Sequence, residues 1–306
     1  MSAAPNPSHP SVPSIQYLIG VDGGGTGTRA RLARPDGRPI GDGEAGPSGL
    51  GQGIAQAWQH IQQAIEKAFA AAGLGVAPPA ICALGLGLAG TDVAQRRIEF
   101  LAAAPGLARI ALESDAYTTL IGAHEGRPGA VVAAGTGSIG SALRADGQLL
   151  SVGGWGFPIG DEGSGAWLGL RAMRHAHRAF DGRAEPGELA RSVWKVAGSS
   201  RESLLDWCER AGQHAYAALA PLVFDAQDSD PAAHKLVVDA AAALEAIAQA
   251  LDPAGALPLV VTGSVGRRLE PLLSTRMRAR LVAPAGNSAD GALRLIRNVL
   301  DEASLS

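Results

Sequence analysis

The fold of this chain is decided by residues 17–27, which read Tyr-Leu-Ile-Gly-Val-Asp-Gly-Gly-Gly-Thr-Gly. The apolar residues before Asp22 are typical of a short buried strand, and the glycines after it end that strand in a tight turn. Thr28 to Ala33 then alternates like a second strand, and Pro35-Asp36-Gly37 turns the chain toward a third. The stretch therefore predicts a strand, a glycine-rich turn and a hairpin.

The same pattern returns 110 residues later. Six identities occur in thirteen positions aligned without a gap. They place Gly25-Thr26-Gly27 on Gly135-Thr136-Gly137, and Arg34, Asp36 and Gly37 on Arg144, Asp146 and Gly147. Chance similarity of two glycine-rich hairpins is the alternative, but the matching residues lie at equivalent positions of the predicted turns and hairpins. We interpret them as a duplicated unit.

The rest of the chain alternates predicted helices and strands. The first half continues with an amphipathic helix over 54–72, a strand over 81–88, a helix over 92–103, a strand over 109–112 and a short helix to His124. The second half becomes helical near 164–180, 185–197, 200–224 and 231–251, the last opened by Asp230-Pro231. A strand over 257–262 and a helix from about 287 follow. We expect a disordered tail over 1–14, an N-terminal domain over 15–125 and a larger C-terminal domain over 126–306.

Composition and charge narrow the class of protein. The 306 residues are 46% hydrophobic and 18% charged with a net charge of −3, which predicts a sizeable core and no basic surface for nucleic acid or anionic lipid. No segment reaches the roughly 18 apolar residues of a membrane span, and residues 1–14 do not resemble a signal peptide. Two cysteines, Cys82 and Cys208, are too few for a disulfide framework or a thiolate zinc site, which fits a reducing cytoplasm.

Glycine-rich turns predict a nucleotide site. The chain has no P-loop, and Gly135 to Gly140 matches the dinucleotide pattern only by accident, because Asp146-Gly147 places a hairpin where that pattern needs a helix. Two strand–turn–strand units can each offer backbone N–H groups to phosphate, and a turn at Gly263 to Gly266 would complete an adenosine pocket. Any one turn alone reads as an ordinary hairpin or strand exit, but the three together favour the site.

Side chains near these turns suit the phosphates of ATP. Hydroxyl donors are available at Thr26, Thr28, Thr136 and Ser138. Asp22, at the end of the first strand, can hold the hydrated Mg²⁺ that accompanies ATP.

At these turns the chain resembles the actin-like sugar kinases. Asp22-Gly-Gly-Gly-Thr26, Gly135-Thr-Gly-Ser138 and Val261-Thr-Gly-Ser264 are similar to their two phosphate motifs and their adenosine motif. More narrowly, Gly153-Gly-Trp-Gly156 and Gly160-Asp-Glu-Gly-Ser164 resemble the N-acetylglucosamine kinase group, which includes bacterial glucosamine kinases and activator ATPases of the benzoyl-CoA reductase type. The similarity runs from about residue 15 to 300. It implies an α/β fold of two duplicated ribonuclease H-like domains with an interdomain cleft.

The resemblance also implies an activity. A cytoplasmic homodimer would transfer the γ-phosphate of ATP, with Mg²⁺, to the 6-hydroxyl of N-acetylglucosamine or glucosamine. Asp115 matches the catalytic aspartate that accepts the hydroxyl proton, although its place between a strand and a helix also suits an N-cap. Asp161 matches a sugar-hydroxyl contact, while Glu162 shares that role or supports the first helical turn. Trp155 either packs on the apolar face of the sugar or fills core.

Two sets of residues are thus assigned to ligands. The residues assigned to ATP are Asp22, Gly24, Gly25, Thr26, Thr28, Gly135, Thr136, Gly137, Gly263 and Ser264. The residues assigned to the sugar are Ser48, Asp115, Ser138, Trp155, Gly156, Asp161 and Glu162.

The chain departs from the family pattern at two positions. The sugar loop near Gly46 to Gly49 usually carries an asparagine, where this chain has Ser48 and then Gly49. Kinases of the animal type carry another asparagine after Gly-Thr-Gly-Ser, where this chain has Ile139. The choice between the two amino sugars therefore stays open.

Two other functions remain as alternatives. An activator ATPase needs cysteines that bridge an iron–sulfur cluster between subunits, which Cys82 in an apolar strand and Cys208 on a helix do not suit. A nucleotide-driven switch or filament subunit needs no sugar pocket, so Trp155, Asp161 and Glu162 argue against it.

Overall fold

The computed structural model describes residues 14–75 and 77–305. The predicted tail over 1–14 lies outside these residues except for Ser14. The chain forms two compact units, one of residues 1–126 with 285–306 and the other of residues 127–284. Among the helices of the described residues, none combines the length and the apolar character that crossing a membrane requires.

The first unit is built on a five-stranded sheet with the order β3-β2-β1-β4-β5. Its strands are β1 (Tyr17–Gly23), β2 (Thr28–Ala33), β3 (Pro39–Ala45), β4 (Cys82–Leu88) and β5 (Arg109–Ser114). The first three are antiparallel neighbours, and β4 and β5 run parallel to β1. Every residue of β4 is buried, because helices cover both faces of the sheet here. This strand order is the ribonuclease H-like one that the sequence predicts.

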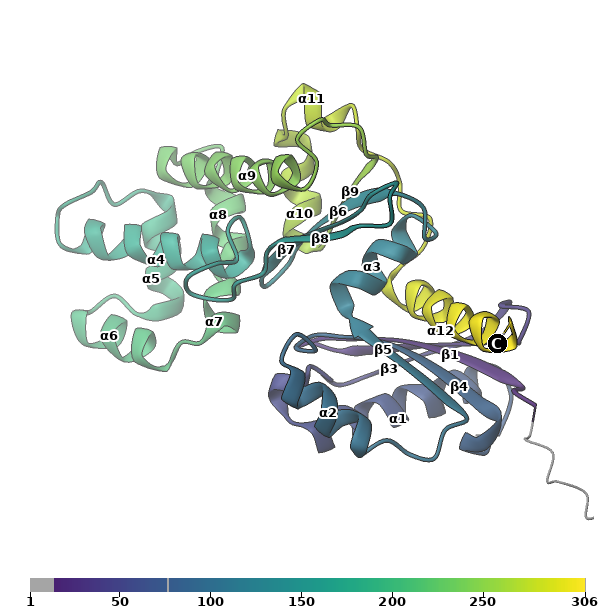
Figure 1. The fold of residues 1–306 in the computed structure, drawn as a ribbon. Coiled ribbons are helices and arrows are strands. Elements are labelled where there is room, and N and C mark those ends of the chain that lie inside the picture. The colour runs from purple at the N-terminus through teal and green to yellow at the C-terminus, as the bar shows by residue number, and fades with distance from the viewer. Residues whose placement is uncertain (1–13, 76, 306) are drawn as a thin grey trace, which may run out of the picture. The chain divides into compact units, whose positions relative to one another are not determined.

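Helices lie on both faces of this sheet (Figure 1). One face carries α1 (Ile54–Ala71) and α2 (Ala94–Ala102), with short 3-10 turns at Leu50–Gln52 and Pro79–Ile81. The other carries α3 (Asp115–Ala123) and α12 (Ser288–Leu305). The predicted apolar face of α1 is buried through Trp58, Ile61 and Phe69, which belong to the core on that side.

Residues 285–306 belong to the first unit, whereas the sequence placed them with the second domain. Helix α12 packs on β1 and β4 because both strands carry a glycine beneath it. Gly20 and Gly85 are register partners, and a Cβ on them would lie 2.2 Å from the Ala289 carbonyl oxygen and 1.9 Å from that of Ala292. The backbone of the helix thus contacts the backbone of the sheet. Local sequence patterns do not predict this contact, because its residues are far apart in the chain.

Replacing Gly85 by alanine is expected to destabilise the protein by at least about 2 kcal/mol, because the added methyl group must displace α12. The measurement is chemical denaturation, in which the midpoint should fall. Gly106→Ala is the control, since a Cβ there meets no atom within 4 Å and we expect a change below about 0.5 kcal/mol. Equal stability of the two variants would show that α12 does not depend on this close approach.

The second unit repeats the arrangement with one strand fewer. Its sheet has the order β8-β7-β6-β9, with β6 (Gly129–Ala134), β7 (Ser138–Leu143), β8 (Leu149–Gly153) and β9 (Leu259–Thr262). A single parallel bridge from Leu259 to Leu281 stands where a fifth strand would be. The turns of the two hairpins agree in detail: Gly37 N donates to Arg34 O over 2.8 Å, and Gly147 N donates to Arg144 O over 3.0 Å. These matches support the duplication inferred from sequence.

Most of the second unit outside its sheet is helical. The helices are α4 (Gly165–Phe180), α5 (Glu188–Ala197), α6 (Arg201–Arg210), α7 (Gln213–Ala217), α8 (Ala220–Ala226), α9 (Pro231–Leu251), α10 (Ser264–Leu269) and α11 (Thr275–Arg278). A 3-10 turn at Glu270–Leu272 follows α10. The single helix predicted over 200–224 is three helices, because Gly212 precedes α7 and Pro221 lies in the first turn of α8. Asp230 caps α9 as predicted, accepting hydrogen bonds from Ala232 N and Ala233 N.

Candidate active site

The first glycine-rich turn forms a pocket of about 410 Å³ in the first unit, lined by Asp22, Gly24, Thr26, Arg29 and Glu44 among others. Gly24 N donates to Gly27 O over 3.0 Å, which closes the turn. The Gly24 carbonyl accepts from Ser48 N and Gly49 N, and the Gly25 carbonyl accepts from the Gln52 side chain. These bonds leave the Thr26 side chain exposed at the pocket.

Two of the predicted ligand residues are used inside the protein. The Thr28 hydroxyl lies 2.6 Å from the Gly46 carbonyl oxygen and 2.7 Å from the Ser48 Oγ. Both side chains are buried, and Ser48 has no exposed surface. Thr28 and Ser48 therefore hold the loop after β3 against β2.

Asp22 and Asp115 lie at the same edge of the sheet. Asp22 is next to last in β1 and pairs with Gly87, while Asp115 directly follows β5, whose last residue Ser114 pairs with Leu88. The carboxyl ends of these parallel strands are where open α/β sheets bind ligands. The helix cap is Ser114, whose hydroxyl accepts from Tyr117 N over 3.1 Å. Asp115 is thus the first residue of α3 and not its N-cap.

The environment raises the pKa of both carboxyl groups. Burial is the main cause for Asp115, whose pKa rises to about 6, and the negative charges of Asp22 and Asp92 add to it. Burial also raises the pKa of Asp22, opposed by a hydrogen bond from Ser288 and by the positive charge of Arg29. Raised carboxyl pKa values in a pocket are typical of catalytic acids and bases, and two nearby acids also invite a cation.

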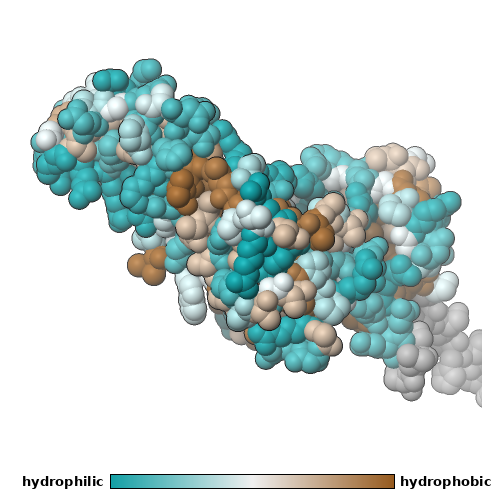
Figure 2. Space-filling model, turned by 90° about the horizontal axis from the view of Figure 1, so that it is seen from above, coloured by the Kyte–Doolittle hydropathy of each residue, from teal (hydrophilic) through white to brown (hydrophobic). Residues whose placement is uncertain are grey.

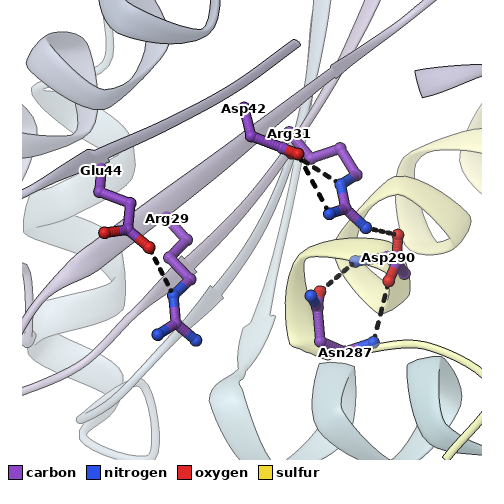
Figure 3. Close-up of polar contacts among 6 residues, drawn as sticks. All are labelled: Arg29, Arg31, Asp42, Glu44, Asn287 and Asp290. Atoms are coloured by element: carbon purple, nitrogen blue, oxygen red, sulfur yellow. Dashed lines mark hydrogen bonds and ion pairs between the residues drawn. The ribbon is translucent and has the colours of Figure 1, made fainter. Parts of the chain in front are cut away.

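Arg29 is a residue that sequence reasoning missed. It stands between Asp22 and Glu44 in the register of β1, β2 and β3, so the three side chains form one row across the sheet. Its Nε bonds Glu44 Oε1 over 3.1 Å, and 64% of its side chain is exposed (Figure 3). The sequence feature that could have indicated Arg29 is the alternating pattern of β2, because it places the Arg29 side chain on the same face of the sheet as that of Asp22.

A second row of charges ties α12 to this sheet (Figure 3). Arg31 bonds both Asp42 on β3 and Asp290 on α12. Asn287 and Asp290 exchange hydrogen bonds in the manner of a capping box, with Asn287 N donating to Asp290 Oδ2 over 2.9 Å and Asp290 N donating to Asn287 Oδ1 over 3.2 Å. These contacts fix the start of α12, where Ser288 reaches Asp22.

The second glycine-rich turn lies in the second unit beneath the start of α4. Gly135 N donates to Gly137 O over 2.9 Å, while Gly165 N and Ala166 N of α4 donate to the carbonyls of Gly135 and Thr136. Gly137 has no room for a side chain, because a Cβ there would lie 2.9 Å from Asp161 Oδ1. The turn is therefore held by the first residues of α4 and by Asp161.

Two of the three predicted turns, those at Gly135 and Gly263, come together in this unit. A pocket of about 170 Å³ is lined by Gly135 and Thr136 from one turn and by Ser264 from the other. Gly263 makes the approach possible, since its φ is +87° and a Cβ on it would lie 2.2 Å from the Ala134 carbonyl oxygen. Residues 128 positions apart in sequence (136 and 264) thus line one cavity.

Helix α8 and Arg268 complete this pocket and were not predicted. Pro221 and Phe224 line one wall, and the Arg268 guanidinium lies 4.2 Å from the centre of the Phe224 ring. Arg268 is also 3.4 Å from Asp225. A flat apolar ring with a stacked guanidinium is a suitable wall for an aromatic base.

Asp161 is buried and holds the loop before α4. It accepts hydrogen bonds from Ser138 N over 3.2 Å and from Gln213 Nε2 over 2.7 Å, and its φ is +60°. The Ser138 hydroxyl donates to the Glu162 carbonyl over 2.7 Å, so Ser138 also serves this loop. Burial raises the pKa of Asp161, and the neighbouring charge of Glu162 adds to it. Gln213, on α7, had no sequence signal.

Trp155 lies on the surface of the second unit. Its side chain is 82% exposed, which excludes a role in the core. Gly154 and Gly156 beside it both have positive φ, and Ile139 packs so closely on Gly154 that a Cβ there would lie 2.8 Å from Ile139 Cδ1. The loop thus presents Trp155 outward from a backbone that only glycine adopts easily.

Known proteins are similar to this chain over most of its length. The sequence model of the BadF/BadG/BcrA/BcrD ATPase family matches residues 19–280. A glucosamine kinase from Vibrio cholerae is 34% identical over 280 residues, covering 91% of this chain and 95% of that protein. An N-acetylmuramic acid/N-acetylglucosamine kinase from Clostridium acetobutylicum is 31% identical over 203 residues, or 65% of this chain and 66% of the relative.

A solved structure agrees with both units. A Chromobacterium violaceum protein, assigned as an N-acetylglucosamine kinase, is 50% identical and superimposes with a TM-score of 0.90. The match covers 93% of this chain and 100% of that one. The actin-like ATPase fold that the sequence predicts is therefore confirmed.

Proposed function

Because this chain belongs to the BadF/BadG/BcrA/BcrD ATPase family, we propose that it is a kinase that transfers the γ-phosphate of ATP to the 6-hydroxyl of glucosamine or N-acetylglucosamine. The observation that carries the proposal is the pair Asp22 and Asp115 at one edge of the first sheet, where burial raises both pKa values. The glucosamine kinase of Vibrio cholerae, which spans nearly the same length, supports the choice of acceptor.

Asp115 would act as the general base. With a pKa of about 6, its carboxylate is ionised at neutral pH yet more basic than an ordinary aspartate. It would accept the proton of the sugar hydroxyl as that oxygen attacks the γ-phosphate. The cap role that competed for Asp115 belongs to Ser114, which leaves this carboxylate available.

Magnesium is part of the proposal, and the residues present fit it. No group of three or more metal-binding side chains is found in the described part of the chain. The neighbouring carboxylates of Asp22 and Asp115 suit Mg²⁺ bound together with ATP, since this ion keeps several waters and takes only one or two carboxylates. Asp22 would hold it through water, next to the negative charge of Asp115. When bound, Mg²⁺ would neutralise charge on the transferred phosphoryl group.

The phosphates of ATP would be held by the two glycine-rich turns. Backbone N–H groups near Gly25 and Gly137 and the hydroxyls of Thr26 and Thr136 would donate to phosphate oxygens. Arg29 would add a fixed positive charge, because one of its nitrogens bonds Glu44 and its side chain lines the pocket beside Asp22. The base would lie against Phe224 and Arg268.

The sugar would be read by Asp115, Asp161 and Glu162. Gly156 would let the Trp155 loop approach it, and Trp155 would cover its apolar face. Ser48 and Ser138 contribute through the loops that they hold, since their hydroxyls are bonded within the protein.

An ADP-release assay with Mg-ATP and a panel of hexoses and hexosamines tests this function. We expect turnover with glucosamine and N-acetylglucosamine well above that with glucose, and little ADP without sugar. ATP turnover that is independent of sugar would instead favour a nucleotide switch. An activator ATPase has no support from the cysteines, since Cys82 is buried and Cys208 lies half-buried, 3.7 Å from His177.

Replacing Thr136 by valine is expected to raise the KM for ATP far more than the KM for sugar. The lost hydrogen bond to a charged phosphate is worth about 1.5–3 kcal/mol, or roughly 10- to 150-fold. Thr275→Val on α11 is the control, because its side chain is exposed and lines neither of the pockets at the glycine-rich turns. A weakened sugar KM with an unchanged ATP KM would assign this turn to the acceptor.

The proposal also includes a homodimer in a reducing cytoplasm, as the resemblance implies. Sedimentation of the purified protein tests the dimer, and a concentration-independent monomer mass would remove it.

A further inference from the structure

The second unit carries a basic pocket that takes no part in the proposed reaction. It lies between α4 and α9 and has a volume of about 670 Å³. Five of its lining side chains are cationic at neutral pH, namely Arg171, Arg174, Arg178, Arg183 and Lys235. Two histidines, His175 and His177, and one carboxylate, Asp239, also line it. The lining is strongly positive although the whole chain has a net charge of −3.

Only part of this charge is neutralised within the protein. Lys235 bonds Asp239 over 2.7 Å, and Arg183 bonds Asp181 over 2.6 Å. Within the residues that the structure describes, Arg174 and Arg178 form no ion pair, and Arg171 lies 3.8 Å from the centre of the Trp167 ring. In the described part of the chain, the guanidinium groups of Arg171, Arg174 and Arg178 therefore have no carboxylate partner.

Helix geometry brings these arginines together. Residues 171, 174 and 178 follow an i, i+3, i+7 spacing, which places them on one face of α4. Like charges at such positions destabilise a helix, so the arrangement costs stability unless an anion lies among them. Guanidinium groups bind phosphate through paired N–H donors, which makes arginine the side chain of choice for such a ligand.

We propose that this pocket binds a small phosphorylated anion at a site separate from that of ATP. Its volume falls in the range of small-molecule pockets, roughly 300–1,000 Å³. A nucleic acid would need a basic stripe along the surface, whereas these charges converge in one hollow. Arg174 lies nine residues beyond Gly165, where α4 contacts the Gly135 turn, so the two sites are about 14 Å apart along one helix.

The surroundings of the pocket fit a charged ligand. The surface over the helical end of this unit, at the left of Figure 2, is predominantly hydrophilic. Arg174, Arg178 and Lys235 are at least partly exposed, so a ligand can reach them without unfolding any part of the unit.

Calorimetric titration with inorganic pyrophosphate tests the proposal, with the nucleotide site filled by Mg²⁺ and a non-hydrolysable ATP analogue. We expect one pyrophosphate per chain. The double variant Arg174→Gln/Arg178→Gln should weaken its Kd by roughly 100-fold, since two hydrogen bonds to a charged group are lost. The control Arg191→Gln/Arg210→Gln, on α5 and α6, removes the same charge outside the pocket and should change the Kd by less than about twofold.

Titration with a second ligand distinguishes a sugar phosphate from an inorganic anion. Tighter binding of glucosamine 6-phosphate than of pyrophosphate, weakened by the double variant, would assign the site to a sugar ester, and the reverse order to an inorganic anion. If the double variant does not fold, Lys235→Gln should weaken binding by about tenfold. The proposal fails if pyrophosphate does not bind once the nucleotide site is filled, or if the double variant binds it as the control does. Binding of a short DNA duplex that the double variant abolishes would also overturn it.

Discussion

Replacing Asp115 by asparagine is expected to slow phosphoryl transfer by about 10²–10⁴-fold, because the variant lacks the base that accepts the sugar proton. Asparagine keeps the acceptor oxygen that bonds Ala116 N over 2.9 Å in the native protein, so the start of α3 should be unchanged. Affinity for ATP and for sugar should stay nearly intact. The measurement is kcat and KM for both substrates in the ADP-release assay.

The same substitution should stabilise the ligand-free protein. The folded pKa of Asp115 is about 6, against an ordinary value of 3.8, so the native state binds more protons than the unfolded chain between these values. Stability therefore falls as the pH rises through this window, and the full loss is present above pH 6. We put it at about 1–2 kcal/mol, because solvent partly screens this half-buried group. Without metal or nucleotide, Tm should rise by roughly 3–6 °C at about pH 7.5 and by much less at about pH 4.

Asp92→Asn is the matched control for Asp115. Asp92 is exposed, and its charge also contributes to the raised pKa of Asp115. Its removal should leave kcat within about threefold, since it only modulates the electrostatics of the base. If Asp115→Asn keeps more than about a tenth of wild-type turnover, the base lies elsewhere. If it is inactive but no more stable, the burial of its charge is not a cost to the folded protein.

Local patterns predicted the parts of the fold that are encoded locally. The stretch around Asp22 contains its own strand, turn and hairpin, and the hairpin turn after Arg144 repeats the hydrogen bonds of the turn after Arg34, so both were readable from sequence. The cap at Asp230 was readable for the same reason, since it depends on residues two and three positions away.

Contacts between distant segments were beyond those patterns. The position of α12 depends on Gly20 and Gly85 leaving room on two strands, and a glycine in a strand also marks bulges, bends and the approach of a ligand. Arg29 is significant only through its register opposite Asp22, and Gln213 only because α7 brings it to Asp161. Ser48 is the opposite case. Its place in a motif assigned it to the sugar, but in the structure its side chain is buried against Thr28.

The choice between the two amino sugars depends on Ser48 and Ile139. The resemblance implies an asparagine in the sugar loop of most such kinases, and another after Gly-Thr-Gly-Ser in those of the animal type. Here the Ser48 hydroxyl is buried and bonded to Thr28, and the Ile139 side chain packs on Gly154, so neither offers an amide to the 2-position of a sugar. A buried amide that pairs with a substrate group can reject an analogue that lacks this group by about 10⁴-fold or more. Isoleucine excludes only by shape, which is worth about 1–3 kcal/mol per methylene-sized difference.

We therefore expect the kcat/KM values for glucosamine and N-acetylglucosamine to differ by less than about 10⁴-fold, with both above that for glucose. Carboxylates at Asp115, Asp161 and Glu162 would read ring hydroxyls and could favour a protonated 2-amine. Ile139→Asn should sharpen the discrimination by restoring an amide, whereas Ile139→Val keeps an apolar contact and should leave the ratio nearly unchanged. The three sugars must be measured side by side with each variant. Glucose preferred over both amino sugars would contradict the acceptor class, and a ratio above about 10⁴ in the wild-type enzyme would mean that other residues read the 2-position.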